Sequence, residues 1–336
     1  MELRDRHGLK EAARTALNQS GSDHRKLVLI HTAATAIVLL ALTGINFLLQ
    51  NQIEDTGGLS GLGTRAILST IQSILQSAGS LALPFWEFGY LFMILYLIRG
   101  ESVSVKTFLS GFRHFGPIIR FLLLKGLLFS LIGMLCFYPS MMIFMMTPLA
   151  QPALKILEPL AAEGMVSASG EILLDEATMT AVTEATAPVI VIFLILYLLL
   201  CIPVFYRLRM GEYSLVQNPK AGAIAALRQS SRMMKGNGFA LFRLDISFWW
   251  YYALEVIISV ICYGDVLLPI LGIQLPFSAN TAFFLFYVLN LLGQIALYTW
   301  KRNEIMGTYA AAFLSMQEVP TTSQPIMPEH RPWDYE

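Results

Sequence analysis

The chain has 336 residues, of which 55% are hydrophobic and only 14% are charged, whereas a soluble domain carries about 25% charged residues. This composition excludes a water-soluble enzyme. The 23 basic and 23 acidic residues cancel, so the net charge gives no indication of nucleic-acid binding. Three cysteines and five histidines are too scattered to predict a disulfide framework, a metal site or any cofactor.

Six stretches are long and apolar enough to cross a membrane, which takes about 20 residues. They cover residues 27–49, 78–98, 121–146, 188–206, 239–262 and 281–300. We therefore predict an all-α polytopic membrane helix bundle with six transmembrane helices. Residues 1–26 form a basic amphipathic segment, 27–306 the transmembrane domain, and 307–336 a Pro-containing tail that is disordered at its end.

The basic residues are distributed unevenly between alternate connections. All except Arg65 and Lys155 fall in the two tails, in the second and fourth connections, or at the adjoining ends of the spans. Because basic connections stay in the cytoplasm, this bias predicts that both termini are cytoplasmic in a multi-pass protein of the cell membrane.

Three segments outside the predicted spans carry helical patterns. Residues 9–17 place Leu9, Ala13 and Leu17 on one stripe, which predicts a helix that lies on an anionic inner leaflet or, equally, a solvated helix. Residues 66–78 predict an outer helix that is broken or kinked before the second span. Residues 147–187 predict a short external helical hairpin.

The cytoplasmic ends of the spans show a threefold pattern. Each even span leaves the membrane through a cation followed closely by a glutamate, and each odd span begins with a cation after a short amphipathic segment. We interpret this as three two-helix repeats, although topology alone also places cations at the interface. The repeat predicts a ring of interfacial ion pairs formed by Glu101, Glu212, Glu304, Arg120 and Arg243.

Two carboxyl groups lie within predicted spans, where ionisable residues are costly. Glu87 lies in the second span and Glu255 in the fifth, and the sixth span carries Asn290 and Gln294 at helical spacing. These four residues predict either a polar site for a cation or a proton, or hydrogen bonds that join neighbouring helices. The second interpretation is favoured. His31 is the only histidine in a predicted span and is weak evidence for a ligand.

The fourth connection carries the most distinctive sequence. It reads Ser230, Met234, Lys235, Gly236, Phe242 and Ser247 at a fixed spacing, and a second motif joins Arg99-Gly100-Glu101 to Phe108 and Gly111-Phe112. These motifs resemble the domain of unknown function 975 family, which consists of bacterial integral membrane proteins of unassigned activity. In this segment, Gly236 is expected to end a helix in the left-handed conformation, and Asp245 to reach an interfacial Arg or Lys.

No nucleophile and base are paired for an intramembrane enzyme, and no phosphate-binding or hydrolase motif occurs. The sequence therefore predicts a non-enzymatic structural, lipid-interacting or accessory component of the cell envelope. Its expected partners are membrane lipids, anionic inner-leaflet lipid in particular, and then another membrane protein, with no nucleic acid. The alternative is a proton- or cation-coupled small-molecule permease that uses Glu87 and Glu255.

Overall fold

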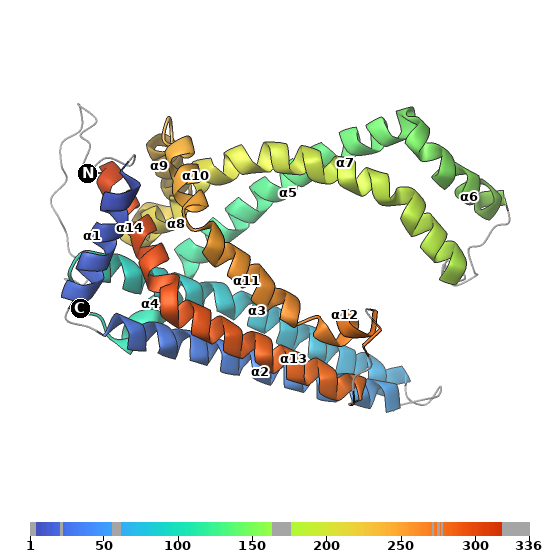
Figure 1. The fold of residues 1–336 in the computed structure, drawn as a ribbon, viewed down its shortest axis with the longest axis horizontal. Helices are drawn as coiled ribbons and strands as arrows, with labels where there is room; N and C mark the ends of the chain where they lie inside the picture. The colour runs from blue at the N-terminus through green and yellow to red at the C-terminus, as the bar shows by residue number, and fades with distance from the viewer. Residues whose placement is uncertain are drawn as a thin grey trace. The chain divides into compact units, whose positions relative to one another are not determined.

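The computed structural model describes residues 5–20, 23–55, 62–162, 176–270, 272–273, 276 and 278–317, and all regular elements among them are helical (Figure 1). The all-α class is therefore confirmed. The chain divides into two compact units. The first joins Met1–Ile118 to Met210–Glu336, and the second is Ile119–Arg209.

Five helices in the described part of the chain are long and apolar enough to cross a membrane. They are α2 (His24–Asp55), α3 (Leu62–Ile98), α5 (Phe115–Met146), α7 (Glu176–Leu208) and α13 (Ala279–Leu297) with its continuation. They correspond to five of the six predicted spans, and the architecture is that of a polytopic helix bundle.

The fifth predicted span, residues 239–262, is not one continuous helix as predicted. It consists of α10 (Gly238–Ile246) and α11 (Trp249–Ile261), which are bent by 61°. At the break the Ser247 and Phe248 N–H groups donate to carbonyls three residues back, and the Ser247 hydroxyl donates to the Leu244 carbonyl. This tight turn ends α10, and the bent pair counts as a sixth span only if it crosses as a unit.

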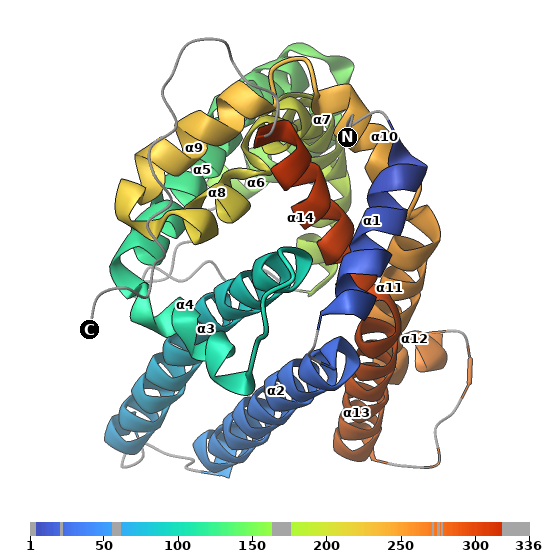
Figure 2. The same ribbon diagram turned by 90° about the vertical axis from the view of Figure 1, so that its left-hand side faces the viewer.

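Five shorter elements surround the last turns of α3 in the first unit. They are α1 (Arg6–Gln19), α8 (Gly211–Gln217), the pair η2 (Val105–Leu109) and α4 (Ser110–Arg113), and α14 (Asn303–Gln317). As a result α3 is buried almost continuously from Phe88 to Leu97. The apolar end of this predicted span is thus a protein core. Figure 2 shows α1 beside α14, with α2 and α3 side by side.

The predicted amphipathic segment at the N-terminus is the helix α1, but neither interpretation of its stripe is correct. Leu9, Ala13 and Leu17 are at most 2% exposed because α14 packs along them. The Lys10 ammonium donates to the Ser247 carbonyl and lies 4.2 Å from the centre of the Phe248 ring. Burial and the neighbouring arginines of α1 lower the pKa of Lys10. The stripe therefore contacts protein instead of lipid or water.

The helix of the sixth span extends well beyond residue 300. After α13 come the π-helical turn η5 (Tyr298–Arg302) and α14, in which Tyr309, Ala310 and Phe313 are buried. The predicted boundary between the transmembrane domain and the tail, at residue 306, therefore falls inside a buried helix. The expected disorder from residue 319 lies outside the described residues.

The helix α3 is continuous from Leu62 to Ile98 and includes Pro84, so the predicted outer helix 66–78 is its first part. Two glycines let η2 and α4 fold directly onto its backbone. A Cβ atom at Gly89 would lie 1.9 Å from the Phe108 carbonyl oxygen, and one at Gly111 would lie 1.8 Å from that of Phe85. Only glycine permits this contact.

The second unit contains α5 and α7, with η3 (Pro148–Ala150) and α6 (Gln151–Ala162) between them. The described part agrees with the predicted hairpin, since Phe144, Ala150 and Ala153 form a small core against α7. Residues 163–175 lie outside the described part of the chain. Apart from this core, most large apolar side chains of α5 and α7 are exposed.

The remaining short helices are η4 (Pro219–Ala221), α9 (Gly222–Met233) and α12 (Gly264–Ile270). The segments α1, η2 with α4, and α9 each precede an odd-numbered span, as the repeat predicts. The third copy differs, because its first span is bent and its second continues into α14. The threefold repeat stays a prediction.

Candidate functional site

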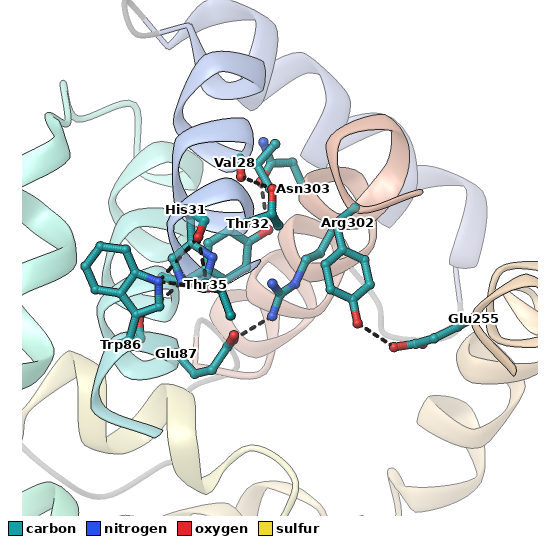
Figure 3. A network of polar contacts seen from close by, with 11 residues as sticks. Val28, His31, Thr32, Thr35, Trp86, Glu87, Glu255, Arg302 and Asn303 are labelled. Atoms are coloured by element: carbon teal, nitrogen blue, oxygen red, sulfur yellow. Dashed lines mark hydrogen bonds and ion pairs between the residues drawn. The ribbon is translucent and has the colours of Figure 1, made fainter. Parts of the chain in front are cut away.

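Arg302 lies at the centre of a polar network in the first unit (Figure 3). Its Nη2 donates to Oε2 of Glu87 at 2.5 Å. The guanidinium also lies 4.5 Å from the ring centre of Tyr90 and 4.7 Å from that of Tyr298, distances at which a cation is attracted to an aromatic face. Arg302 therefore joins α3 to the end of the last span through one carboxylate and two rings.

The helix geometry explains how Arg302 reaches this position. Asn290, Gln294, Tyr298 and Arg302 are spaced four residues apart, so they follow one side of a helix. The π-helical turn covers the last five residues of this run, Tyr298–Arg302. Such turns are rare and frequently occur at functional sites.

A second branch of the network leads to α11. The Tyr298 hydroxyl donates to Oε1 of Glu255 at 2.8 Å (Figure 3). Gln294 donates to the side chain of Asn290, which donates in turn to the Ile258 carbonyl at 2.7 Å. That carbonyl lies in the last turn of α11, where helical carbonyls lack intrahelical partners. Asn290 thus caps a helix end.

A third branch consists of aromatic residues and amides. His31 stacks on Trp86 with ring centres 5.1 Å apart, and Trp86 Nε1 donates to the Thr35 hydroxyl at 3.0 Å. The buried Tyr90 hydroxyl donates to Asn303, whose amide donates to the His24 carbonyl. These bonds connect α2, α3 and the start of α14.

The network borders a cavity of about 30 Å³. Its polar lining consists of Thr32, Thr35, Glu87, Gln294, Tyr298 and Arg302. A water molecule needs roughly 10–15 Å³ of such volume, so the cavity has room for water but not for an organic solute. Among the described residues, no three His, Cys, Asp or Glu side chains are placed to hold a metal ion.

The structure brings the four predicted intramembrane residues into one network. Glu87 and Gln294 line the cavity, Glu255 is joined to it through Tyr298, and Asn290 through Gln294. Both carboxylates have a partner within the chain, one cationic and one phenolic.

In the structure Glu304 pairs with cations other than those that the predicted ring assigns to it. Its carboxylate pairs with Lys301 at 2.9 Å and with Arg14 of α1 at 3.2 Å, and neither cation was a predicted partner. Asp245 accepts a hydrogen bond from the Tyr309 hydroxyl, and its expected contact with an interfacial cation stays a prediction.

The other members of the ring occupy separate places. Glu101 follows the turn after α3, Glu212 lies in the first turn of α8, and Arg243 is exposed on α10. Arg120 belongs to the second unit. The ring stays a prediction.

The motif residues of the fourth connection have mainly structural positions. Ser230 and Met234 are buried at the end of α9, while Lys235 is exposed. Gly236 has a φ of +83°, which confirms the expected left-handed conformation. In the following helix Phe242 is 40% exposed, and Ser247 ends α10.

Sequence reasoning missed three central residues of the network. In the sequence Arg302 stands only among the cations that end the even spans, although one further helical turn along the polar stripe of α13 leads to it. His31 was set aside as a lone histidine, and no sequence signal pairs it with Trp86, 55 residues away. Asn303 carried no signal, because its role depends on α14 being buried.

The comparisons with known proteins identify a family and nothing more specific. No curated protein and no solved structure matches the chain. A family model described as "Protein of unknown function (DUF975)" matches residues 1–293, so Tyr298, Arg302 and Asn303 lie beyond the matched part. Since the match covers most of the sequence, the chain belongs to the DUF975 family.

Proposed function

We propose that the protein is a non-enzymatic component of the bacterial cell membrane with a structural, lipid-interacting or accessory role. In this proposal the ionisable residues of the spans hold helices together and do not carry a solute. The observation that carries it is the internal pairing of both candidate carboxylates, Glu87 with Arg302 and Glu255 with Tyr298.

The small size of the cavity supports the same function. A solute-binding pocket usually encloses roughly 300–1,000 Å³, whereas the cavity beside Glu87 measures about 30 Å³. Removal of Glu87 would leave the Arg302 charge, whose side chain is only 16% exposed, without its carboxylate partner, which is destabilising. The Glu87–Arg302 pair therefore has a structural use that needs no transported substrate.

The contact between α1 and α14 supports a topology with both ends of the chain in the cytoplasm. Because α1 precedes the first span and α14 follows the last, their packing requires an even number of crossings between them. Five unbroken helices and the bent α10–α11 pair satisfy this condition as six crossings. The cytoplasmic side is assigned by the bias of Lys and Arg.

The exposed apolar surface of the second unit supports contact with lipid. None of the most apolar 18 residues of the helix that contains α7 is buried, and only 11% of the corresponding residues of α5 are. In a bilayer such surfaces are solvated by acyl chains. Membrane lipids are therefore the proposed principal partners, and another membrane protein is the second candidate.

Flux measurements in proteoliposomes test this proposal. We expect the wild-type protein to carry no proton or cation flux above that of empty liposomes, and Glu87→Gln and Glu255→Gln to leave this background unchanged. A gradient-dependent flux in the wild type that both variants abolish would overturn the proposal. Mass spectrometry of the purified protein should detect tightly retained phospholipid.

A proton- or cation-coupled permease is the second candidate function. It is favoured by one observation, the polar cavity that Glu87 lines beside a π-helical turn. The Glu87 side chain is 42% exposed, so the carboxylate is accessible from outside the network. The same flux experiment decides between the two functions.

A further inference from the structure

The helix α10 presents an apolar face that the other described helices of the first unit leave exposed. Phe239 and Ile246, which share one side of the helix, are 71% and 50% exposed. Trp249, just beyond the bend, is 68% exposed. The opposite side carries the buried residues Leu241 and Leu244, so α10 is apolar on both sides and exposes an aromatic group on the outer one.

The charge around this face is almost entirely positive. From Tyr213 to Leu254 the only acidic residue is Asp245, which accepts a hydrogen bond from Tyr309. Four exposed cations lie on α9, on α10 and in the turn between them: Arg228, Arg232, Lys235 and Arg243. An apolar aromatic face beside exposed cations complements an anionic phospholipid surface.

The orientation of α10 favours the membrane interface over the hydrocarbon core. The helix is bent by 61° from α11 (Figure 1), so when α11 runs along the membrane normal α10 is the strongly tilted end of the same crossing, at the membrane interface. Arg243 and Asp245 lie within α10, and charges are costly at the centre of a bilayer. Aromatic side chains are enriched at the depth of the headgroups.

The helices α1 and α10 of the first unit differ in the cover of their apolar side chains. In α1 the apolar stripe is covered by α14, and Lys10 and Arg14 contact Ser247 and Glu304. In α10 the side chains of Phe239 and Ile246 are exposed. The apolar stripe of α1 therefore cannot make the lipid contact expected of it, whereas the exposed side chains of α10 can.

We propose that α10 is a membrane-interface helix that binds the anionic phospholipid of the surrounding leaflet. Phe239, Ile246 and Trp249 lie among the upper parts of the acyl chains, while Lys235 and Arg243 contact the headgroups. This inference rests on the proposed lipid-interacting function and names its lipid class and the helix responsible.

Depth-dependent fluorescence quenching tests the inference on the full-length protein. The three native cysteines are replaced by alanine, and an environment-sensitive fluorophore is attached to Phe239→Cys or, as a control on α1, to Thr15→Cys. Each protein is placed as a single copy in nanodiscs that contain phosphatidylcholine or phosphatidylglycerol spin-labelled near the headgroup or near the end of the chain.

We expect the label at 239 to be quenched more by the shallow spin label than by the deep one, and the label at 15 by neither. Spin-labelled phosphatidylglycerol should quench the label at 239 about fivefold more than phosphatidylcholine does, since each basic residue near an anionic surface adds to the attraction. Lys235→Gln with Arg243→Gln should remove this preference, whereas Lys106→Gln with Arg113→Gln should leave it.

Three results would overturn the inference. They are no quenching at 239, stronger quenching by the deep label, and equal quenching by the two lipid classes. If the label at 239 is shielded only in discs that hold two copies, the face binds a second copy of the chain and the inference is also wrong. The quenching results do not depend on the flux measurement in proteoliposomes. A failure of this inference is therefore distinguishable from a failure of the proposed function.

Discussion

The apolar ends of α3 and α7 have the same kind of sequence and opposite surroundings. In α3, 56% of the most apolar 18 residues are buried by other helices of the first unit, whereas in α7 none of the corresponding residues are. Hydropathy reports only that a segment avoids water. It does not report whether protein or lipid replaces the water, and this difference determines where the fold is sensitive to substitution.

The two helices differ in sensitivity because a protein core and lipid acyl chains surround an apolar side chain in different ways. A side chain that leaves water for a protein core gains packing contacts that a substitution removes. A side chain that faces acyl chains has no such fixed partner, because lipid tails are as apolar as leucine. We therefore expect large effects in the core around α3 and small effects on α7.

The largest effect is expected at Gly89, where α3 contacts η2. Gly89→Ala places a Cβ atom 1.9 Å from the backbone oxygen of Phe108, a clash that no side-chain rotation relieves. We expect the free energy of unfolding to fall by about 4 kcal/mol or more, as measured by thermal unfolding in detergent. The control is Gly126→Ala on α5, where a Cβ atom meets nothing within 4 Å; equal losses in the two variants would contradict the comparison.

A matched pair of leucines tests the comparison itself. Leu95 of α3 is 0% exposed and Leu199 of α7 is 68% exposed. Leu95→Ala should lower the free energy of unfolding by about 3 kcal/mol, the usual loss for a core leucine. Leu199→Ala should lower it by less than about 0.5 kcal/mol. If Leu199→Ala has the larger effect, α7 is covered by protein in the membrane and the contrast between the two helices is wrong.

A smaller effect is expected from a hydroxyl group in the polar network. Tyr298→Phe removes the donor to Glu255 and keeps the ring beside Arg302, so the loss should be about 1 kcal/mol, typical of one hydrogen bond. Tyr263→Phe, at a site that is 63% exposed, is the matched control and should change the unfolding temperature little. Equal stability of Tyr298→Phe and wild type would show that this hydrogen bond contributes nothing.

The smallest effect is expected at the contact between α1 and α14. The Arg14 side chain is 59% exposed in its pair with Glu304, and such pairs contribute about 0.5 kcal/mol or less. Arg14→Gln should therefore lower the unfolding temperature slightly, and added salt should reduce the difference. A loss that salt does not reduce would contradict a solvent-screened pair.

The sequence predicted the class, five of the spans and the short helices before them, because these depend on local patterns of apolar and basic residues. It did not predict that the stripe of α1 is covered by α14, since that contact joins residues almost 300 positions apart. The bend after Ile246 was missed because the apolar run continues across it. Charges alone could not pair Glu87 with Arg302, since the π-helical turn that presents Arg302 has no known pattern in the sequence.

The central claim is that the charges within the spans hold helices together, and a double-mutant cycle on Glu87 and Arg302 tests it most directly. The cycle compares the free energy of unfolding of Glu87→Gln, Arg302→Met and the double variant with that of the wild type. The account predicts a coupling energy of about 2 kcal/mol, as for two directly paired side chains. Additive losses, with a coupling energy near zero, would contradict it.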